Sequence, residues 1–359
     1  MTAGAGSVEI PAADLAAVAA RLFLAAGIQA SDAAVVAQDL VAADLEGVAS
    51  HGVMLAPMYV ARIRAGSVSR ESRGVIVSDR GGAVVIDARN VLGQLTARQA
   101  AGLAIDRARR HGLAAASLRD AFHFGAAGLY ARLMAEAGCI GVVMTNTRPL
   151  MPAPGGAEPI TGNNPIAIAA PGDGGFAPEV DMATSAAAMG KIRNAAAAGE
   201  PIPPGWATDR DGVPTQDAKA AIAGMLTPAA GPKGFGLGFM IDLLCGGLSG
   251  GAIGAGVQGL YGDPAIPYGC SSLFLAIDVA HFADLETFKA RAGAEVARVG
   301  AARRAPGVER VYAPGEYAFA TRSRAEGRCR IGAPVLRSLI AAAGELGVAI
   351  GDLLPEKAA

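Results

Sequence analysis

Charged residues are scarce in this sequence of 359 residues, and neither sign of charge predominates. Charged side chains make up 18% of it, against about 25% in a typical globular protein. Its 31 Lys and Arg residues almost balance its 32 Asp and Glu residues. Without an excess of positive charge, a strongly basic surface for nucleic acid or for an anionic membrane is not expected.

Cysteines and long hydrophobic runs are also few. The four cysteines form no CxxC pair, which argues against a zinc knuckle or a thioredoxin-type motif and indicates buried free thiols. The N-terminal stretch lacks the basic and apolar parts of a signal peptide. The uncharged stretch 243–261 holds seven glycines among 19 residues, which suits a helix end and loops better than a membrane span. We therefore expect a cytoplasmic protein with reduced thiols.

Glycine and apolar residues are plentiful. Glycine supplies 49 of the 359 residues, roughly twice its usual share, with no Gly-x-y repeat, so many tight turns are expected rather than collagen. Apolar residues make up 52%, which excludes general disorder. The length predicts about two domains.

Apolar periodicity and turn residues predict an order of helix, mixed α/β, then helix. Ser31 is the expected N-cap of the second helix, and Gly66 and Gly112 the expected ends of later ones. The two helical ends are expected to pack together around an inserted α/β body. Helices are predicted at 11–27, 32–46, 55–64, 95–110, 126–137, 186–198, 234–248, 285–300 and 333–347, and strands at 74–79, 83–87, 113–118, 140–145, 165–170, 177–183 and 273–279.

Standard motifs give little. Gly254-x-Gly256-x-x-Gly259 matches the dinucleotide fingerprint, but a predicted helix precedes it and a loop follows it, so we interpret the match as coincidence. No P-loop, HExxH, GxSxG or EF-hand loop is present, so the common hydrolase and metal-site hypotheses have no support.

Only four histidines are available for proton transfer near neutral pH. His111 follows a basic helix end and suits the helix dipole, and His281 ends a strand, where a structural role is expected. His51 lies at a junction between helices, and His123 at a strand-to-helix turn, and both are positions where functional side chains concentrate.

Small polar residues gather at predicted strand ends, in 145–147, 161–165 and 181–185. Asp181 can be read as part of a helix cap or as a functional carboxylate. Two lysines, Lys191 and Lys233, lie among glycines, where free amides and a positive charge together can hold a diphosphate.

Taken in order, these segments resemble the malate/L-lactate dehydrogenase family of the second, non-Rossmann type. That family includes ureidoglycolate and sulfolactate dehydrogenases, diketogulonate reductase and Δ1-piperideine-2-carboxylate reductases. The resemblance spans nearly the whole chain and rests on SHGV at 50–53, HFGAAGLYARLMAEAG at 123–138, TNT at 145–147, GNNP at 162–165, DMATS at 181–185, GK at 190–191, GPKGFGL at 231–237 and PGE at 314–316.

The resemblance implies an α/β fold in two parts. A non-Rossmann NAD(P)-binding domain with a large, mainly antiparallel sheet would span 73–283. A helical substrate and dimerisation domain would combine 1–72 and 284–359. The family uses NADH or NADPH, forms homodimers with the active site near the interface, and moves hydride to or from the α-carbon of a 2-hydroxy, 2-oxo or cyclic imino acid.

The resemblance also implies roles for individual residues. His51 matches the catalytic histidine, Ser50 a substrate-contacting serine, and Asp181 a carboxylate that orients and charges the histidine. An imidazolium can neutralise the negative charge that develops when hydride adds to C=O, and a carboxylate favours that imidazolium. The cofactor segments supply His123, Thr145, Asn164, Thr184, Ser185, Lys191 and Lys233.

One departure concerns the substrate. The family pattern SHGVxRxP carries an arginine that grips a carboxylate, and Leu55 stands in its place. Leucine cannot replace a bidentate guanidinium. Either Arg148 supplies the charge from another loop, or the substrate lacks the usual carboxylate and packs against Met54 and Leu55. Arg148 can also be read as a solvated loop residue.

The sequence therefore predicts an oxidoreductase with a specialised C=O or C=N substrate. The alternative is a nucleotide-binding pseudoenzyme with a regulatory or scaffold role, for which the missing arginine is the support. The presence of Ser50, His51 and Asp181 argues against it.

Overall fold

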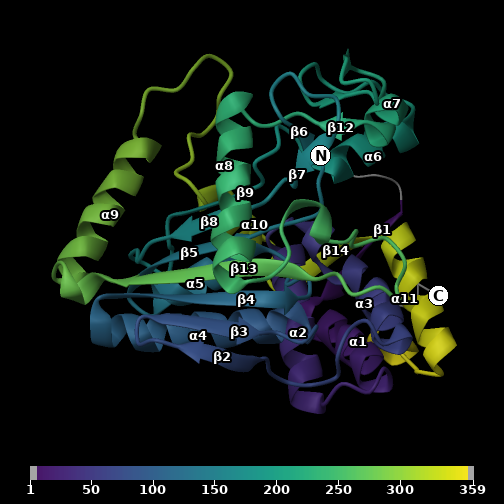
Figure 1. Ribbon diagram of the computed structural model, residues 1–359, viewed down its shortest axis with the longest axis horizontal. Coiled ribbons are helices and arrows are strands. Elements are labelled where there is room, and N and C mark those ends of the chain that lie inside the picture. The colour runs from purple at the N-terminus through teal and green to yellow at the C-terminus, as the bar shows by residue number, and fades with distance from the viewer. Residues whose placement is uncertain (1–5, 355–359) are drawn as a thin grey trace.

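A seven-stranded sheet forms the centre of the computed structural model, which describes residues 6–354 (Figure 1). All neighbouring strands are antiparallel except β3 and β4, which are parallel. The predicted class, α/β with a large, mainly antiparallel sheet, is confirmed. The strand order is β2 (Val75–Asp79), β3 (Ala83–Asp87), β4 (Leu113–Ala121), β13 (Cys270–Asp278), β5 (Cys139–Thr145), β8 (Ile166–Ala169) and β9 (Glu179–Met182).

Two helices, α4 (Gly93–His111) and α5 (Ala127–Glu136), cover one face of the sheet. The strands send a fully buried row of side chains toward this face, from Ala116 through Phe274 and Val143 to Ala167. The buried side of α4 is largely alanine, so the helix can approach the strands closely.

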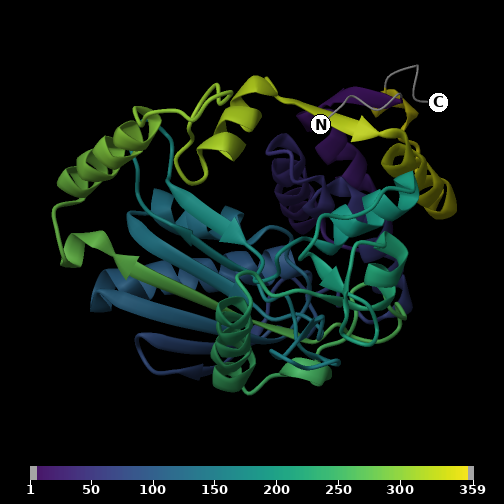
Figure 2. The ribbon, with the colours of Figure 1, turned by 90° about the horizontal axis from the view of Figure 1, so that it is seen from above.

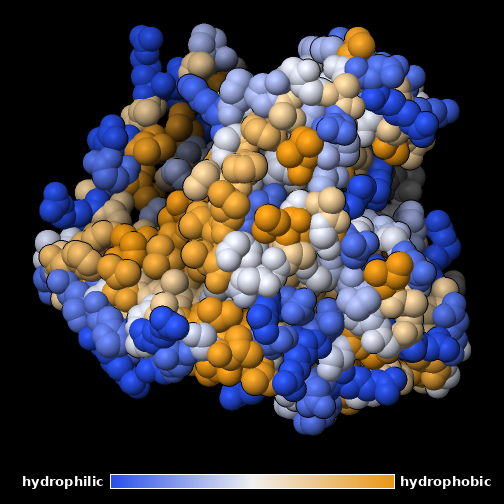
Figure 3. All heavy atoms as spheres, in the orientation of Figure 1, coloured by the Kyte–Doolittle hydropathy of each residue, from blue (hydrophilic) through white to orange (hydrophobic). Residues whose placement is uncertain are grey.

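The opposite face is covered only in part. Helix α8 (Pro232–Asp242) and the π-helical turn Leu243–Gly247 pack Ile241 and Cys245 against Met144 and Leu273. Beyond α8 the strands leave apolar side chains exposed, among them Ile168 on β8. Figure 3 shows apolar side chains gathered on this surface beside α8.

The two ends of the chain meet in a second, mainly helical region. Strand β1 (Ser7–Pro11) pairs with β14 (Arg328–Gly332), and Figure 2 shows the two strands lying beside the helices of this region. The predicted packing of the chain ends is observed, whereas the division into domains at residues 72 and 284 stays a prediction. The helices here are α1 (Ala12–Ala25), α2 (Ala30–Leu45), α3 (Ala56–Ala65) and α11 (Ala333–Leu346).

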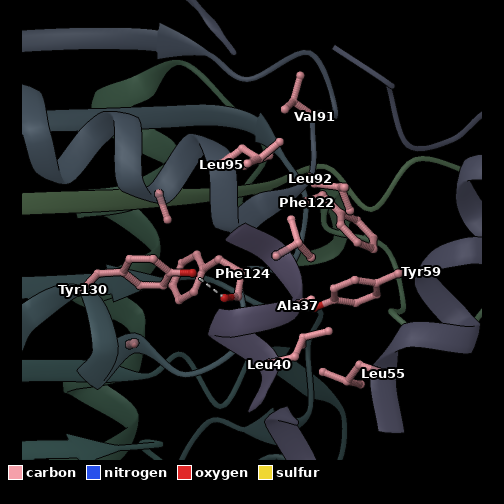
Figure 4. Close-up of a cluster of buried hydrophobic side chains, with 14 of the residues drawn as sticks. Ala37, Leu40, Leu55, Tyr59, Val91, Leu92, Leu95, Phe122, Phe124 and Tyr130 are labelled. Carbon is pink, nitrogen blue, oxygen red and sulfur yellow. Dashed lines mark hydrogen bonds between the residues drawn. The ribbon is translucent and has the colours of Figure 1, made fainter. Parts of the chain in front are cut away.

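One hydrophobic core joins this helical region to the sheet. Leu40 and Tyr59 from the helices lie close to Phe122 and Phe124, which follow β4, and to Tyr130 of α5 (Figure 4). Edge-to-face ring contacts link Tyr59 to Phe122 and Phe124 to Tyr130. The helical region is therefore packed directly against the elements that follow the sheet.

A small subdomain with its own core lies beside α8. Its core contains Met151, Ile192 and Leu226. The two remaining long helices are α9 (Leu285–Gly300) and α10 (Glu316–Arg324). The subdomain comprises β6 (Met151–Pro152), β7 (Pro159–Thr161), α6 (Met189–Ala198), β10 (Ala207–Thr208), β11 (Pro214–Thr215), α7 (Ala218–Ala223) and β12 (Met225–Leu226).

Several local predictions need correction. The helix expected to begin at 11 is preceded by strand β1, which ends at Pro11. Ser31 is not an N-cap, because α2 begins at Ala30 and its cap position is Gln29. The 181–185 segment does not open a helix directly, since Asp181 lies in β9 and α6 begins only at Met189.

Other predictions are confirmed. Helices α3 and α4 end at Gly66 and Gly112, both at positive φ, and β2 and β3 form the expected hairpin. The Gly254–Gly256 segment is a single 3-10 turn after a helix, not a dinucleotide loop. All four cysteines are buried and free. Within residues 6–354, no helix is long and apolar enough to cross a membrane.

Candidate active site

The structure brings His51 and His123 together. His51 ends the 3-10 turn Ala49–His51 between α2 and α3, and His123 lies just after β4. Their rings stack with centroids 5.8 Å apart and an angle of 22° between the planes. Ser50 Oγ lies 2.9 Å from His51 Nδ1, so this serine can fix the orientation of the imidazole. Two histidines from separate parts of the chain thus share one site.

Asp181 approaches the pair from β9. It occupies the same row of the sheet as Ala167, which places its side chain on the face toward α5. Its Oδ2 accepts a hydrogen bond of 2.7 Å from the Gly128 amide at the start of α5. A β-carbon on Gly128 would lie only 3.0 Å from that oxygen, so glycine permits this close approach. The helix start holds the carboxylate in place and favours its charge.

Burial and charge oppose each other at His51. Burial lowers its pKa below 6.5, and the negative charge of Asp181 acts in the opposite direction. The pKa of Asp181 is raised, mainly because surrounding protein atoms desolvate the carboxylate. Part of the residue nevertheless stays exposed. The Gly128 hydrogen bond and His51 limit this rise. His51 is therefore a neutral base near pH 7 that a carboxylate can help to protonate.

His123 is held as a neutral ring. Its Nδ1 lies 2.6 Å from the Tyr59 hydroxyl and 3.3 Å from the amide of Gly125, which can only donate. Nδ1 is therefore the acceptor, and Nε2 carries the hydrogen. Burial, and then the charge of His51, lower the pKa of His123 to about 3. His123 can donate a hydrogen bond through Nε2, but it does not carry a charge near pH 7.

Asp44 was not predicted as a site residue, but it shapes the turn that carries His51. Its Oδ2 accepts a 2.8 Å hydrogen bond from the Val53 amide. A β-carbon on Gly52 would lie 2.2 Å from its carboxylate, so the turn folds tightly over Asp44. Burial raises the pKa of Asp44 to about 7. Gly52 of the SHGV segment thus makes room for a half-buried acid, Asp44, which lies nine residues before Val53.

A buried polar network supports the loops that follow β5. Asn146 Nδ2 lies 3.1 Å from Asp242 Oδ1, and Thr161 Oγ1 lies 2.9 Å from Asp242 Oδ2. Asn164 donates to Gly238 O at 2.8 Å, and its Oδ1 accepts from the Thr147 amide at 2.8 Å. Asn164 therefore shapes the loop. Asn146 and Asp242 were not predicted as site residues.

Thr145 is also internal. Its hydroxyl donates to Ser271 O at 2.9 Å and accepts from Ser272 Oγ at 2.9 Å. These contacts join the ends of β5 and β13. They leave the hydroxyl committed to the sheet, so any influence of Thr145 on a cofactor acts through loop position.

The predicted cofactor segments 184–185 and 231–234 lie side by side. The Ala229 amide donates to Thr184 O, and Gly234 comes so close to Thr184 that a β-carbon would lie 2.9 Å from that carbonyl. The Ser185 hydroxyl donates a hydrogen bond of 2.8 Å to Ala187 O. The Thr184 hydroxyl is buried and has no hydrogen-bond partner among the described residues.

Both predicted lysines are exposed. Lys233 is the second residue of α8, after Gly231 at positive φ and Pro232. Lys191 is the third residue of α6, and its Nζ lies 5.9 Å from the Trp206 ring centroid. An unpaired buried hydroxyl and two lysines near helix starts fit the diphosphate of a nicotinamide dinucleotide, which needs amides, hydroxyls and positive charge.

The substrate residues are placed differently from expectation. Leu55 is 1% exposed and packs in the core beside Leu40 and Tyr59 (Figure 4), so its predicted contact with substrate is corrected. The 3-10 turn Val53–Leu55 leads into α3, and its register turns Leu55 inward. Met54 is 40% exposed instead. Arg148 is exposed and lies beside Gly259.

Comparison with known proteins identifies the class as an NAD(P)-dependent oxidoreductase, and the mainly antiparallel sheet is of the non-Rossmann type. The chain belongs to the malate/L-lactate dehydrogenase family, whose model matches residues 10–341. It is 35% identical over 353 residues to a malate dehydrogenase from Pyrococcus abyssi, covering 96% of this chain and 95% of that protein.

Solved structures agree with this membership. The sulfolactate dehydrogenase of Methanocaldococcus jannaschii superposes with a TM-score of 0.90 at 33% identity, covering 96% of this chain and 99% of that one. The Δ1-piperideine-2-carboxylate reductase of Pseudomonas syringae superposes with a TM-score of 0.83 at 30% identity, covering 93% and 99%. Solved structures with this fold thus include proteins named as a dehydrogenase and as a reductase.

Proposed function

We propose that the protein transfers hydride between NAD(P)H and the C=O or C=N carbon of a small 2-oxo, 2-hydroxy or cyclic imino substrate, with His51 exchanging the proton. The observation that carries this proposal is the placement of His51 between Ser50, His123 and Asp181. In this proposal, residues 73–283 bind the nucleotide, and residues 1–72 together with 284–359 contact the substrate and the second subunit. The enzyme is proposed to be cytoplasmic.

Residues of this chain supply the proton that the substrate takes up during reduction. Ser50 engages Nδ1 of His51, which leaves Nε2 as the atom that faces the substrate. In reduction, Nε2 donates its proton to the substrate oxygen or nitrogen, and Asp181 stabilises the imidazolium beforehand. When bound, NAD(P)H supplies the hydride. Neutral His123 offers a hydrogen-bond donor beside the reacting group and does not compete for the proton.

The cofactor is held, in this proposal, by the segments around α8. The Thr184 hydroxyl, Lys191 and Lys233 would contact its phosphates, with Ser185 and His123 at the same site. Thr145 and Asn164 act by fixing the loops. NADH and NADPH both remain compatible with this arrangement.

The substrate is proposed to be a specialised one. With leucine in the arginine position and turned into the core, the segment 50–57 offers no guanidinium to a carboxylate. We therefore expect poor activity on malate and lactate. The remaining polar candidate for a substrate anion is Arg148, and the apolar contact is Met54 rather than Leu55.

The test is oxidation of NADH and NADPH with pyruvate, oxaloacetate and a cyclic imino acid, alongside binding of both cofactors followed by fluorescence. Turnover of at least one substrate that falls about 10²–10⁴-fold in His51→Ala supports the proposal. Cofactor binding with no turnover across the panel favours the alternative, a nucleotide-binding pseudoenzyme. Binding of neither cofactor below millimolar concentration contradicts both.

A homodimer is part of the proposal. The open face of the sheet carries Leu113, Ile168 and Val180, which are 52%, 38% and 38% exposed, and α8 adds Phe239 and Met240 at its border. A continuous exposed apolar surface of this kind is typical of an interface. A second copy is the proposed partner, because these side chains carry no charge and two such faces can meet without repulsion.

A further inference from the structure

A buried cluster of charges lies next to Asp181, outside the group of residues that exchanges the proton. Arg132 of α5 binds two acids, with Nη1 2.6 Å from Glu179 Oε1 and Nη2 2.5 Å from Glu46 Oε1. The arginine side chain is 16% exposed and each glutamate side chain 8%. Buried ion pairs add little stability compared with apolar side chains of similar volume. Stability alone therefore does not account for this cluster.

Glu179 is a second carboxylate on the face of β9 that carries Asp181. Glu179 pairs with Ala169, and Asp181 pairs with Ala167, so both side chains point to the side of the sheet that α5 covers. Both also reach the start of α5. The position that a β-carbon on Gly128 would take lies 3.0 Å from Asp181 Oδ2 and 3.4 Å from Glu179 Oε2. The two carboxylates are therefore close enough to repel each other.

The helix start satisfies only one of these carboxylates. The Gly128 amide donates to Asp181, whereas Glu179 Oε2 is buried and has no hydrogen-bond partner in the part of the chain that the structure describes. Burial raises the pKa of Glu179, Arg132 opposes this rise, and the charges of Glu46 and Asp181 add to it. Arg132 thus compensates the charge that Glu179 brings close to Asp181.

The PGE segment at 314–316 fixes the stem of Glu179. The Glu179 amide donates to Pro314 O at 3.2 Å, and a β-carbon on Gly315 would lie 2.5 Å from Glu179 Cγ. Gly315 has a φ of 81°, which favours glycine. This close packing keeps the carboxylate of Glu179 beside Arg132.

Arg132 is the permanent positive charge among the groups that face the His51–Asp181 pair. Burial raises the pKa of Asp181, and the Gly128 amide, His51 and Arg132 oppose this rise. His51 itself responds to the charge of Asp181. The other titratable or charged groups around the pair are neutral His123, half-buried Asp44 beneath the turn that carries His51, Glu179 and, through Arg132, Glu46.

We propose that Arg132 is a positioning residue that keeps the negative charge of Asp181 available to His51, because it neutralises the competing carboxylate of Glu179. The inference rests on the proposed function, in which His51 exchanges the proton. Without a cation beside them, two neighbouring buried carboxylates tend to share one proton instead of both staying ionised. Asp181 would then be protonated for part of the time, and the imidazolium of His51 would lose its partner.

The first experiment titrates His51 by NMR, which needs no substrate. The chain has four histidines, and the His51 signal is the one that disappears in His51→Asn. Arg132→Met should lower the pKa of His51. Adding Glu179→Gln should return this pKa close to its wild-type value, because the competing carboxylate is gone and Arg322 lies 4.0 Å from the remaining acid, Glu46. An unchanged pKa in Arg132→Met, or a double variant as low as the single one, overturns the proposal.

Arg98→Met is the matched control. Arg98 of α4 binds Asp39 of α2, whose side chain is 3% exposed, so this variant also leaves a buried acid without its arginine. Arg98 is not among the charges that act on Asp181. The His51 pKa should therefore stay at its wild-type value, and a fall equal to that in Arg132→Met would contradict a specific role of Arg132.

Arg132→Lys replaces Arg132→Met if the methionine variant does not fold. Lysine keeps the charge but lacks the planar fork that binds two carboxylates at once. The His51 pKa should then fall by less, and Glu179→Gln should again recover it. No fall, or a fall that Glu179→Gln does not recover, overturns the proposal.

The second experiment measures kcat/KM for reduction against pH, with a substrate that the wild type turns over. A lower His51 pKa reduces the protonated fraction at about pH 8, so Arg132→Met should lose about tenfold there, the change that accompanies one unit of pKa. The loss should shrink as pH falls and His51 becomes protonated in both proteins. Cofactor affinity should stay close to that of the wild type. A loss of equal size at every pH would indicate a displaced structure and contradict the proposal.

Failure of the proposed function is recognised separately. If the wild type turns over no substrate, the NMR titration still decides the role of Arg132. A fall in the His51 pKa that Glu179→Gln recovers supports that role without catalysis. Turnover that depends on His51, together with an unchanged His51 pKa in Arg132→Met, retains the proposed function and overturns this inference.

Discussion

At the scale of single residues, the two histidines differ because of what surrounds them. His123 receives a hydroxyl and an amide on one nitrogen and no carboxylate, so it stays neutral. His51 is also buried, but Asp181 lies near enough to favour its charged form. Only His51 therefore has a neighbouring carboxylate that favours its protonated form, so the two stacked rings do not both carry a charge.

This difference predicts opposite pH dependences for the two directions of reaction. Reduction needs protonated His51, so kcat/KM for reduction should fall as pH rises through the His51 pKa, which lies below 6.5. Oxidation needs neutral His51 and should rise through the same pH. The measurement is kcat/KM against pH in both directions on the free enzyme.

His51→Asn is the control for this profile. It should remove the pH dependence below pH 7 and lower the rate by about 10²–10⁴-fold, with cofactor affinity close to that of the wild type. A variant that keeps both the rate and the profile would show that another group or water supplies the proton.

Asp44 predicts a pH dependence of stability. Its folded pKa of about 7 lies above its ordinary value of 3.8. The folded state therefore keeps a proton that the unfolded state has lost, and the stability tied to this group is full below pH 3.8 and is lost as pH rises toward and through 7. Each unit of pKa difference corresponds to about 1.4 kcal/mol.

Asp44→Asn should keep an acceptor for the Val53 amide while removing the titration. We expect a higher free energy of unfolding at pH 8 and a flatter slope between pH 4 and 8, measured by urea denaturation. Asp44→Ala should be less stable than Asp44→Asn, since it leaves the Val53 amide unpaired. A wild-type slope retained in Asp44→Asn would assign the titration elsewhere.

At the scale of elements, the start of α5 sets the position of Asp181. Gly128→Ala would place a β-carbon 3.0 Å from Asp181 Oδ2 and 3.2 Å from its Cβ. The carboxylate must then shift, so kcat should fall about tenfold or more, as for a displaced catalytic group. Cofactor affinity should change little, because Gly128 lies outside the segments around α8. Stopped-flow turnover and fluorescence titration separate the two effects.

Gly102→Ala is the matched control on α4. No atom lies within 4 Å of the position that its β-carbon would take. Alanine should stabilise the helix by about 0.5–1 kcal/mol and leave turnover unchanged. If Gly128→Ala behaves like Gly102→Ala, the position of Asp181 does not depend on the start of α5.

The elements also show what the sequence could and could not predict. The β2–β3 hairpin and the ends of α3 and α4 have local signals, alternation and glycines at positive φ, and were predicted. Strand β1 was missed because its partner, β14, lies at the other end of the chain, and no local pattern records such pairing. The two-residue strands of the small subdomain are too short to leave any periodicity.

The candidate site divides in the same way. His51, His123 and Asp181 were identified because their motifs occur in a family pattern, and the structure brings them together. The inward turn of Leu55 depends on the register of a 3-10 turn, which sequence spacing does not determine. Arg132 looked like any other helix arginine, because its partners Glu46 and Glu179 lie 86 and 47 residues away along the chain.

At the scale of the whole molecule, the site lies where two regions meet. His51 comes from the helical region built by the chain ends, whereas His123 and Asp181 follow or belong to strands of the sheet. Since a single hydrophobic core spans the junction, the relative placement of the two regions is fixed by packing. A second subunit that packs against this junction would therefore also affect the catalytic rate.

The last prediction concerns the open face of the sheet as an interface between two copies. Ile168 and Val180 are paired neighbours there, both 38% exposed, and Ile168→Lys with Val180→Lys would put two like charges on an apolar surface. Two facing copies would then meet with four positive charges, so the proposed dimer should dissociate to half the mass in light scattering after size exclusion. Val213→Lys is the control, because Val213 is 55% exposed but belongs to the small subdomain. Asp181 lies beside Val180 on the same strand. Dissociation should therefore also lower kcat, whereas a monomeric wild type, or a double variant that keeps its mass, would contradict the interface.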